Sequence, residues 1–517
     1  MNLVSSVHQT AQTNPHKIAY RFMGQDTTYA AFDLSVSMFA SALKDLGVNE
    51  GDKVAFLLGN TPHYLISLYA TMRIGATAVP INPLYTPDEI SYILENSDAK
   101  VVIAVDQLLP LVEVASQTFP TIENFIVCEV NPDAGEKLDA LAEQIKPKVH
   151  PFTTLMKQAK PLTEMVTVDE NESAVILYTS GTTGRPKGAM LTHKNIYSNA
   201  RDVADYLGFS ENDRIVATLP LFHVFALTVV ANAPLLKGAT ILLEPRFSPG
   251  DIFTVIREQK ATVFAGVPTM YNFLYQYPEG KTEDFETIRL SISGGSSLPV
   301  SLLHDFEEKF QVRVSEGYGL SEASPVTCFN PLDRERVPGS IGTNITNVEN
   351  KVVNELGEEV PVNEVGELIV RGPNVMKGYY KQPEETAATI RDGWLYTGDL
   401  ARRDENGYFY IVDRKKDMII VGGFNVYPRE VEEVLFSHRD IIEAAVVGIP
   451  DTNFGEEVHA YVVLKEGSEA TAQTIHDFCA KRLVKYKVPK HIEFLEELPK
   501  NTTGKILRRS LKDQIRS

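Results

Sequence analysis

The chain has 517 residues, more than a single small core needs, so two or more folding units are expected. Hydrophobic residues make up 43% and charged residues 23%, which is typical of a soluble globular protein and disfavours a disordered or fibrous one. The formal net charge of −18 disfavours nucleic-acid binding, which needs basic surface to displace counterions. It does not exclude small anionic ligands, because local cations and backbone N–H groups hold those.

The three cysteines, Cys128, Cys328 and Cys479, are widely separated and form no C-x-x-C spacing. This pattern disfavours a disulfide framework or a structural zinc site, and it fits a reducing compartment. Residues 1–15 lack the basic segment and apolar run of a secretory signal. We therefore expect a cytoplasmic protein.

The first hundred residues alternate between helical and strand patterns. Apolar residues from Phe32 to Leu46 recur at helical spacing, and the continuous apolar run 54–58 is typical of a strand buried on both faces. The alternation continues with a helix at 65–72, a strand at 76–81, a helix beginning at Thr86 and Pro87, and a strand at 100–105. Such alternation predicts a mostly parallel sheet with helices on both faces.

The pattern changes after about residue 330. Runs at 366–370 and 407–412 predict short strands between glycine turns, hence a β-rich subdomain. The charge run 413–417 marks a boundary, which gives domains at 1–413 and 414–517. The second domain should hold a helix opened by Pro428, strands near 444–449, 458–464 and 492–495, and a helix around 474–483. The fold class is therefore α/β: a large N-terminal domain of mostly parallel sheets flanked by helices plus the β-rich subdomain, and a small α+β C-terminal domain.

The most apolar stretch is 219–236. Pro220, His223, Asn232 and Pro234 interrupt it, whereas a membrane span needs roughly 20 mostly apolar residues. A buried segment beside a ligand pocket is the better interpretation.

A glycine- and hydroxyl-rich turn follows the apolar run 174–177. Glycines let backbone N–H groups approach a polyanion, hydroxyls donate further hydrogen bonds, and a lysine adds charge. The turn differs from the common phosphate loop G-x-x-x-x-G-K-[ST], which disfavours a P-loop ATPase. Its predicted phosphate-binding residues are Thr179, Ser180, Gly181, Thr182, Thr183, Gly184 and Lys187.

The segment 179–188 resembles the phosphate loop of the adenylate-forming superfamily, which contains acyl-CoA synthetases, peptide-synthetase adenylation domains and firefly luciferase. Four later segments match that family in order, so the resemblance covers essentially the whole chain. They are an adenine and magnesium segment at 317–322, a ribose segment at 396–399, a hinge at 413–416 and a C-terminal lysine loop at 499–505.

The resemblance implies roles for individual residues. Tyr318 would offer a flat face to the purine, Glu322 and Thr182 would bind Mg²⁺, and Asp399 would accept hydrogen bonds from the ribose. Taken singly, Tyr318 also suits a core and Asp399 a turn. The other residues assigned to ATP or AMP are Gly294, Gly295, Ser296, Gly319, Ser321 and Arg414.

The implied reaction has two steps: a carboxylate attacks the α-phosphate of Mg·ATP, and a thiolate then attacks the acyl carbon and releases AMP. Lys505 would neutralise charge in the first step. His223 would lie where the acyl and thiol sites meet, although a lone histidine in apolar sequence is usually a packed core residue. A mobile C-terminal domain would rotate about Lys416 and bring Gly422 and Gly423 in to line a coenzyme A tunnel.

The chain is most similar to bacterial long-chain fatty acyl-CoA ligases at 392–399 and 423–428. Ile420 stands where luciferase-like and coumarate-ligase-like members carry lysine, which disfavours those two assignments. The expected catalytic residues are Lys505, His223 and Glu322, and the expected small molecules are a fatty acid, ATP, Mg²⁺ and coenzyme A.

Several alternatives stay open. The acid is either long-chain, medium-chain or aryl, and the acceptor is either coenzyme A or a carrier protein. A catalytically inactive binding protein on the same fold is the rival from a different class. Peripheral contact with membranes and a homodimer are also left open by the sequence.

Overall fold

The computed structural model describes residues 2–162, 165–179, 185–501 and 504–516, and its first elements follow the predicted alternation. The capping box predicted at Thr86 is present: Thr86 Oγ1 accepts a hydrogen bond from Glu89 N, and the Glu89 carboxylate accepts one from Thr86 N. The early elements are α1 (Leu3–Thr13), α2 (Tyr29–Asp45), β3 (Lys53–Leu57), α3 (Pro62–Arg73), β4 (Thr77–Pro80), α4 (Pro87–Asn96) and β5 (Ala99–Val105). Each predicted element in this region is confirmed within a few residues.

The first sheet runs in the order β19-β9-β8-β4-β3-β5-β6-β7. Its central strands pair in parallel, while β8 and β9 form an antiparallel hairpin. Its remaining strands are β6 (Asn124–Cys128), β7 (Val149–Pro151), β8 (Ser173–Thr179), β9 (Lys187–Thr192) and β19 (Gly378–Tyr379), with α5 (Leu109–Thr118), α6 (Ala134–Asp139) and α7 (Phe152–Gln158) beside it. Apolar clusters cover both faces, as expected for a mostly parallel sheet.

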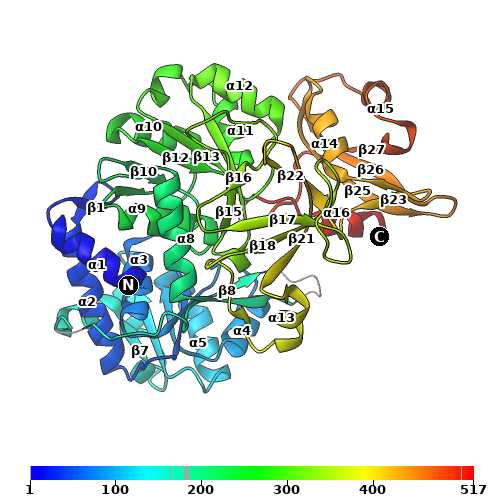
Figure 1. The fold of residues 1–517 in the computed structure, drawn as a ribbon. Helices are drawn as coiled ribbons and strands as arrows, with labels where there is room; N and C mark the ends of the chain where they lie inside the picture. The colour runs from blue at the N-terminus through cyan, green and yellow to red at the C-terminus, as the bar shows by residue number, and fades with distance from the viewer. Residues whose placement is uncertain (1, 163–164, 180–184, 502–503, 517) are drawn as a thin grey trace.

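The second sheet runs in the order β16-β15-β14-β13-β12-β10-β11-β1-β2. The first strand of the chain belongs here, because Tyr20 pairs with Ile241 in parallel, and the sequence did not predict this partition. Its strands are β1 (Ile18–Phe22), β2 (Gln25–Thr28), β10 (Arg214–Ala217), β11 (Thr240–Leu243), β12 (Val263–Gly266), β13 (Leu290–Ser293), β14 (Val314–Gly319), β15 (Val326–Phe329) and β16 (Thr343–Asn344). The helices α10 (Pro249–Gln259), α11 (Pro268–Gln276) and α12 (Val300–Phe310) accompany it (Figure 1).

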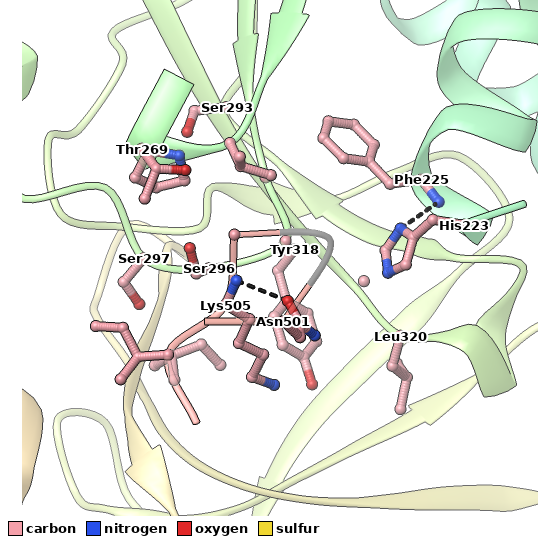
Figure 2. A pocket seen from close by; sticks show the side chains of 18 of the residues that line it. His223, Phe225, Thr269, Ser293, Ser296, Ser297, Tyr318, Leu320, Asn501 and Lys505 are labelled. Atoms are coloured by element: carbon pink, nitrogen blue, oxygen red, sulfur yellow. Dashed lines mark hydrogen bonds between the residues drawn. The ribbon is translucent and has the colours of Figure 1, made fainter. Parts of the chain in front are cut away.

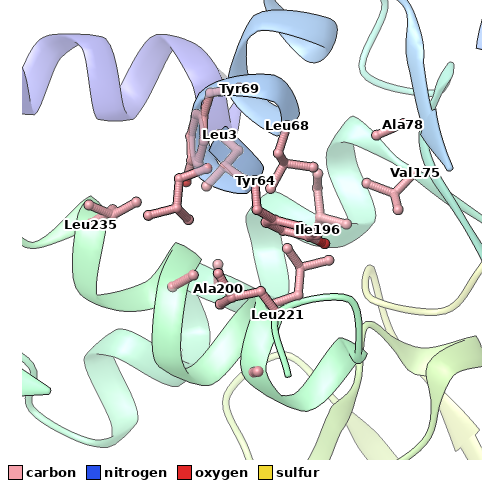
Figure 3. Packing of buried hydrophobic residues seen from close by; sticks show 14 of the residues in the cluster. Leu3, Tyr64, Leu68, Tyr69, Ala78, Val175, Ile196, Ala200, Leu221 and Leu235 are labelled. Atoms are coloured by element: carbon pink, nitrogen blue, oxygen red, sulfur yellow. The ribbon is translucent and has the colours of Figure 1, made fainter. Parts of the chain in front are cut away.

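A shared apolar core joins the two sheets through α8 (His193–Tyr206), α3 and α1 (Figure 3). The predicted buried segment 219–236 lies in this core, where it forms a π-helix at Ala226–Asn232 followed by α9 (Ala233–Leu236). Tyr69 Oη donates a hydrogen bond of 2.9 Å to Asn232 Oδ1, which satisfies one polar group of the segment. Within the described ranges, no helix is long and apolar enough to cross a membrane.

The β-rich subdomain predicted from short strands between glycine turns is present, and its strands pair in antiparallel fashion. It contains β17 (Glu349–Val353), β18 (Gly366–Arg371), β20 (Ile390–Arg391), β21 (Trp394–Arg403) and β22 (Phe409–Arg414), with α13 (Pro383–Thr389) next to β19. A turn at 415–417 then leads into the C-terminal part, where Asp417 N donates a hydrogen bond of 3.0 Å to Arg414 O. The predicted boundary between residues 413 and 414 lies just before this turn and stays a prediction.

The C-terminal part has its own apolar core and lies beside α12 and the β-rich subdomain (Figure 1). Its elements are β23 (Ile419–Val421), β24 (Phe424–Val426), α14 (Pro428–Phe436), β25 (Ile441–Asp451), β26 (Gly455–Leu464), α15 (Ala472–Ala480), β27 (His491–Phe494) and α16 (Arg508–Arg516). The helix predicted at Pro428 is confirmed, as are the strands predicted at 444–449 and 458–464 and, to within one residue, the strand predicted at 492–495. The expected α+β character is therefore present.

Candidate active site

A cavity of about 1460 Å³ lies where the carboxyl ends of β12, β13 and β14 meet the β-rich subdomain and the C-terminal loop 499–508. Figure 2 shows His223, Tyr318 and Lys505 around this space. Parallel strands commonly present binding residues at their carboxyl ends. The predicted site residues that line the cavity are Thr179, Lys187, His223, Gly294, Gly295, Ser296, Tyr318, Gly319, Ser321, Glu322, Asp399, Arg414, Lys416 and Lys505.

The predicted phosphate turn is flanked by β8 and β9. Thr179 ends β8 and pairs with Lys187, which begins β9 in the antiparallel hairpin. The remaining predicted residues of this turn, Ser180, Gly181, Thr182, Thr183 and Gly184, lie outside the described residues. The two strands thus fix where the turn leaves and re-enters the sheet.

Lys187 is nearly buried and belongs to a network of polar side-chain contacts at the cavity wall. Its ammonium group pairs with Glu385 of α13 and lies 5.4 Å from the centre of the Tyr379 ring. Tyr379 Oη in turn donates a hydrogen bond of 2.8 Å to Glu322 Oε1. The sequence identified Lys187 and Glu322 but missed Tyr379 and Glu385, which no local motif marks.

Tyr318 and Asp399 join the second sheet to the β-rich subdomain. Tyr318 lies near the end of β14, and its hydroxyl donates a hydrogen bond of 2.5 Å to Asp399 Oδ2 on β21. Burial, followed by the adjacent Asp399 charge, raises the pKa of Tyr318 well above its usual value. Arg414 pairs with Asp399 across β21 and β22, with Nε 3.4 Å from Oδ1. The result is a buried carboxylate held between a phenol and a guanidinium at the cavity wall.

Gly294 and Gly317 allow close packing in the cavity floor. A Cβ at Gly294 would lie 3.2 Å from the Phe225 ring, and a Cβ at Gly317 would lie 2.3 Å from Phe329 Cδ2. Gly295 follows with φ of +82°, which an L side chain rarely adopts, and Ser296 is exposed to the cavity. The absent Cβ atoms of Gly294 and Gly317 therefore make room for the Phe225 and Phe329 rings.

Lys505 comes from the C-terminal loop and faces the same cavity (Figure 2). Asn501 Oδ1 accepts a hydrogen bond of 2.8 Å from Lys505 N. The loop fits tightly against α11, because a Cβ at Gly504 would lie 2.6 Å from Thr269 Oγ1. Burial, together with the positive charge of Arg414, lowers the pKa of Lys505 to about 8.

His223 lies across the pocket from the Lys505 loop (Figure 2). Its Nδ1 accepts a hydrogen bond of 3.3 Å from Phe225 N, so Nε2 carries the proton of the neutral ring. Burial, with a smaller effect from the Lys505 charge, lowers the pKa of His223 to about 4. The side chain is therefore a neutral hydrogen-bond donor near pH 7.

Gly422 and Gly423 form the turn between β23 and β24, with φ of +57° and +84°. Neither is among the described residues that line the cavity. Lys416, in contrast, lies in the turn after β22 and does line it. The structure therefore brings Lys505 to the cavity and leaves the predicted tunnel residues away from it.

Glu316 and Arg429 are cavity residues that the sequence did not indicate. Glu316 lies on β14, where its Oε1 accepts a hydrogen bond of 3.2 Å from Leu298 N. Burial raises the pKa of Glu316 to about 7, against the opposing effect of the Arg429 charge. Arg429 belongs to α14 and donates to the Ile411 carbonyl, so this cluster links the two parts of the chain.

The chain is similar to known proteins over nearly its whole length. The family model described as AMP-binding enzyme matches residues 7–380, and the model of the AMP-binding enzyme C-terminal domain matches residues 430–505. The long-chain-fatty-acid–CoA ligase of Bacillus subtilis is 40% identical, covering 99% of this chain and 94% of that protein. The feruloyl-CoA synthase of an Amycolatopsis species is 36% identical, covering 96% of each chain. The ATP-bound structure of MatB from Rhodopseudomonas palustris is 32% identical with a TM-score of 0.88, covering 100% of this chain and 99% of that one.

The chain belongs to the AMP-binding enzyme family, and the resemblance found in its motifs is confirmed. Within that family it is an AMP-forming acyl-CoA ligase.

Proposed function

We propose that this ligase activates a fatty acid, in particular a long-chain one, as acyl-AMP and transfers the acyl group to coenzyme A. The observation that carries the proposal is that Lys505, from the C-terminal loop, borders the same cavity as His223 and the Tyr318–Asp399 pair. Groups suited to a nucleotide, a carboxylate and a transferring phosphoryl group therefore surround one space.

In the first step the acid's carboxylate oxygen bonds to the α-phosphorus of ATP, and the bond to the β-phosphate breaks to release pyrophosphate. Asp399 accepts hydrogen bonds from the ribose hydroxyls, and Tyr318 and the backbone at Gly294, Gly295 and Ser296 flank the adenine. Gly319, Ser321 and Arg414 complete the nucleotide wall, and the turn 179–187 binds phosphates. Lys505 donates its charge to the carboxylate and α-phosphate oxygens.

The Glu322 carboxylate fits a magnesium ion that arrives with ATP. One oxygen accepts a hydrogen bond from the Tyr379 hydroxyl, which orients the carboxylate, and the other oxygen would bind the metal. Mg²⁺ usually combines one or two protein carboxylates with substrate phosphates, and Thr182 is the second predicted ligand. When bound, the ion neutralises phosphate charge.

The apolar cavity wall favours an aliphatic acid. Leu219, Val224 and Val229 are buried and line the cavity, and Val229 lies in the π-helix that follows His223. Such a wall binds a hydrocarbon chain by removing it from water, at about 0.8 kcal/mol per methylene. The neutral His223 Nε2–H would donate to the carboxylate at the polar end of the chain.

In the second step a thiolate bonds to the acyl carbon, and the bond to AMP breaks. Lys505 and the tunnel turn at Gly422 and Gly423 cannot both occupy the site, so we propose that the domain 414–517 rotates against 1–413 about Lys416. Gly422 and Gly423 lie outside the described cavity lining. This position supports a second arrangement of the two domains, in which their turn reaches the site. Contact with membranes and dimer formation stay predictions.

The test is pyrophosphate exchange into ATP, followed by coenzyme A-dependent AMP release, with saturated fatty acids of graded length and with ferulate. Fatty acids should support both reactions more efficiently than ferulate. Exchange with ferulate alone would overturn the fatty acid assignment and favour the aryl alternative. Ferulate is the aryl acid tested because the chain is similar to a feruloyl-CoA synthase.

Two lysine variants separate catalysis from folding. Lys505→Ala should lose most pyrophosphate exchange, by a factor on the order of 100 to 1000. Lys490→Ala is the matched control, because Lys490 pairs with Glu457 and is not among the described cavity residues. Unchanged exchange in Lys505→Ala would refute the role of Lys505.

A further inference from the structure

Part of the cavity wall lies along the end of α8 and on β15; we call it the α8 branch and define it by Val203, Tyr206, Leu207, Val326 and Phe329. All of these except Tyr206 are buried and purely apolar, whereas Tyr206 is half-buried. A pair of hydrogen bonds between the Asn199 side chain and the Val326 backbone, 2.8 and 3.0 Å long, ties α8 to β15. The walls of the branch are therefore fixed to each other.

The α8 branch continues from the site of chemistry through a row of close contacts. The Phe225 ring, next to His223, lies against Gly294, and the Cβ position of Gly294 is 3.6 Å from the Gly317 carbonyl. Gly317 in turn packs against the Phe329 ring. Phe329 meets the Tyr206 ring edge to face, with centroids 6.2 Å apart. Phe225, Gly294, Gly317, Phe329 and Tyr206 all line the cavity, so this row follows its wall from the neighbour of His223 to Tyr206.

Tyr206 is held in place by polar contacts on its outer side. Its hydroxyl donates a hydrogen bond of 3.1 Å to the Phe329 carbonyl and lies 3.5 Å from Thr343 Oγ1. Arg334 donates a hydrogen bond of 3.1 Å to that same Thr343 oxygen. Tyr206 lines the cavity, whereas Thr343 and Arg334 are not among the described residues that line it, so the ring lies between the apolar wall and these polar groups.

We propose that the ring of Tyr206 forms the end wall of the acyl-binding branch and sets the longest fatty acid that the enzyme activates efficiently. This inference rests on the proposed function. Acids that end before the ring gain binding energy with each methylene, whereas longer acids must displace the ring or leave carbon atoms in water. The kcat/KM should therefore rise with chain length up to the acid that reaches Tyr206 and fall for longer acids.

The test compares kcat/KM for pyrophosphate exchange with octanoate, dodecanoate, hexadecanoate and octadecanoate. Tyr206→Ala removes the ring while keeping a strong helix former, so the ratio for octadecanoate over dodecanoate should rise by about tenfold. Tyr206→Phe keeps the ring and loses only the hydroxyl, so it should keep the order of the wild type. Tyr197→Ala is the matched control, because Tyr197 is an α8 tyrosine that contacts Arg201 and is not among the described cavity residues.

Tyr206→Trp keeps the test informative if the smaller variant folds poorly. A larger ring should shorten the branch and lower the same ratio by a similar factor. Ratios that stay at the wild-type value in Tyr206→Ala and Tyr206→Trp, with ATP binding intact, would overturn the assignment of Tyr206 and leave the proposed function standing. A wild-type enzyme that exchanges pyrophosphate with none of the four acids would instead remove the fatty acid substrate, and with it this role of Tyr206.

Discussion

The Tyr318 hydroxyl donates a hydrogen bond of 2.5 Å to Asp399 Oδ2, although the two residues lie 81 positions apart on β14 and β21. The same carboxylate has the Arg414 Nε at 3.4 Å from its other oxygen. A carboxylate fixed from both sides in a nearly buried position is oriented before any ligand arrives, which lowers the entropic cost of binding. We infer that this pair orients Asp399 for the ribose.

Asp399→Ala should therefore weaken ATP binding. The loss of hydrogen bonds to a charged acceptor, about 1.5–3 kcal/mol, corresponds to a rise in the KM for ATP of roughly tenfold to a hundredfold. Tyr318→Phe leaves the carboxylate in place and frees its orientation, so its effect on the same KM should be smaller. Measurement of pyrophosphate exchange against ATP concentration checks both variants, and a larger rise in KM for Tyr318→Phe than for Asp399→Ala would contradict this role of the carboxylate.

Lys505 predicts a fall in activity at alkaline pH. Burial, with the charge of Arg414, lowers the pKa of this amine to about 8, and only the protonated form neutralises the anionic reactants. The kcat/KM for pyrophosphate exchange should therefore be highest below about pH 8 and should decline as the pH rises through that value. The fall would follow loss of the Lys505 charge in the free enzyme.

Lys505→Arg separates this ionisation from others. A guanidinium stays protonated far above pH 8, so the alkaline fall should disappear even if the maximal rate is lower. Lys490→Ala should keep the wild-type profile. A pH profile of Lys505→Arg with an unchanged fall near pH 8 would assign the ionisation to another group.

The sequence predicted the parts of the structure that local signals specify. The capping box at Thr86 and the buried run in β3 depend on neighbouring residues, so their positions follow from spacing alone. The motif residues Tyr318, Asp399 and Lys505 were also found in advance, and the fold brings them to one cavity. The resemblance of their segments to a known family identified them, because each of these side chains taken singly also suits a structural role.

Contacts between distant segments were not predictable in this way. Glu385 reaches Lys187 across 198 residues, and β1 joins β11 in the second sheet because of tertiary packing. Glu316 precedes the recognised segment 317–322 by one residue, yet nothing in the sequence indicates that Arg429 would approach it. Such pairs become visible only when the sheets and the C-terminal part are assembled.

We expect that the His223 imidazole does not titrate near its ordinary pKa. Burial lowers the pKa of this imidazole to about 4, so the ring is neutral from about pH 5 upward and donates through Nε2. His223→Ala should lower kcat/KM by about tenfold or more through the lost hydrogen bond, and His223→Gln should recover part of it through its amide N–H. Activity measured between about pH 5 and 7 should show no ionisation that disappears in His223→Gln; such an ionisation would mean that the ring acts as a charged acid.

Because Gly317 is packed tightly, we expect a larger side chain at this position to lower both the stability of the fold and the affinity for the fatty acid. A Cβ at this position would lie 2.3 Å from Phe329 Cδ2, so Gly317→Ala forces the Phe329 ring to move. Overpacking of this kind costs about 1–3 kcal/mol, which should lower the midpoint of thermal unfolding. Because Phe329 also lines the cavity, the KM for the fatty acid should rise more than the KM for ATP.

Gly59→Ala is the matched control for this substitution. A Cβ at Gly59 meets nothing within 4 Å, and its φ lies outside the left-handed region, so the unfolding midpoint should change little. Thermal unfolding followed by circular dichroism, with both KM values measured on the same preparations, checks the pair. Equal losses in the two variants would show that an added methyl group, and not the contact with Phe329, causes the effect.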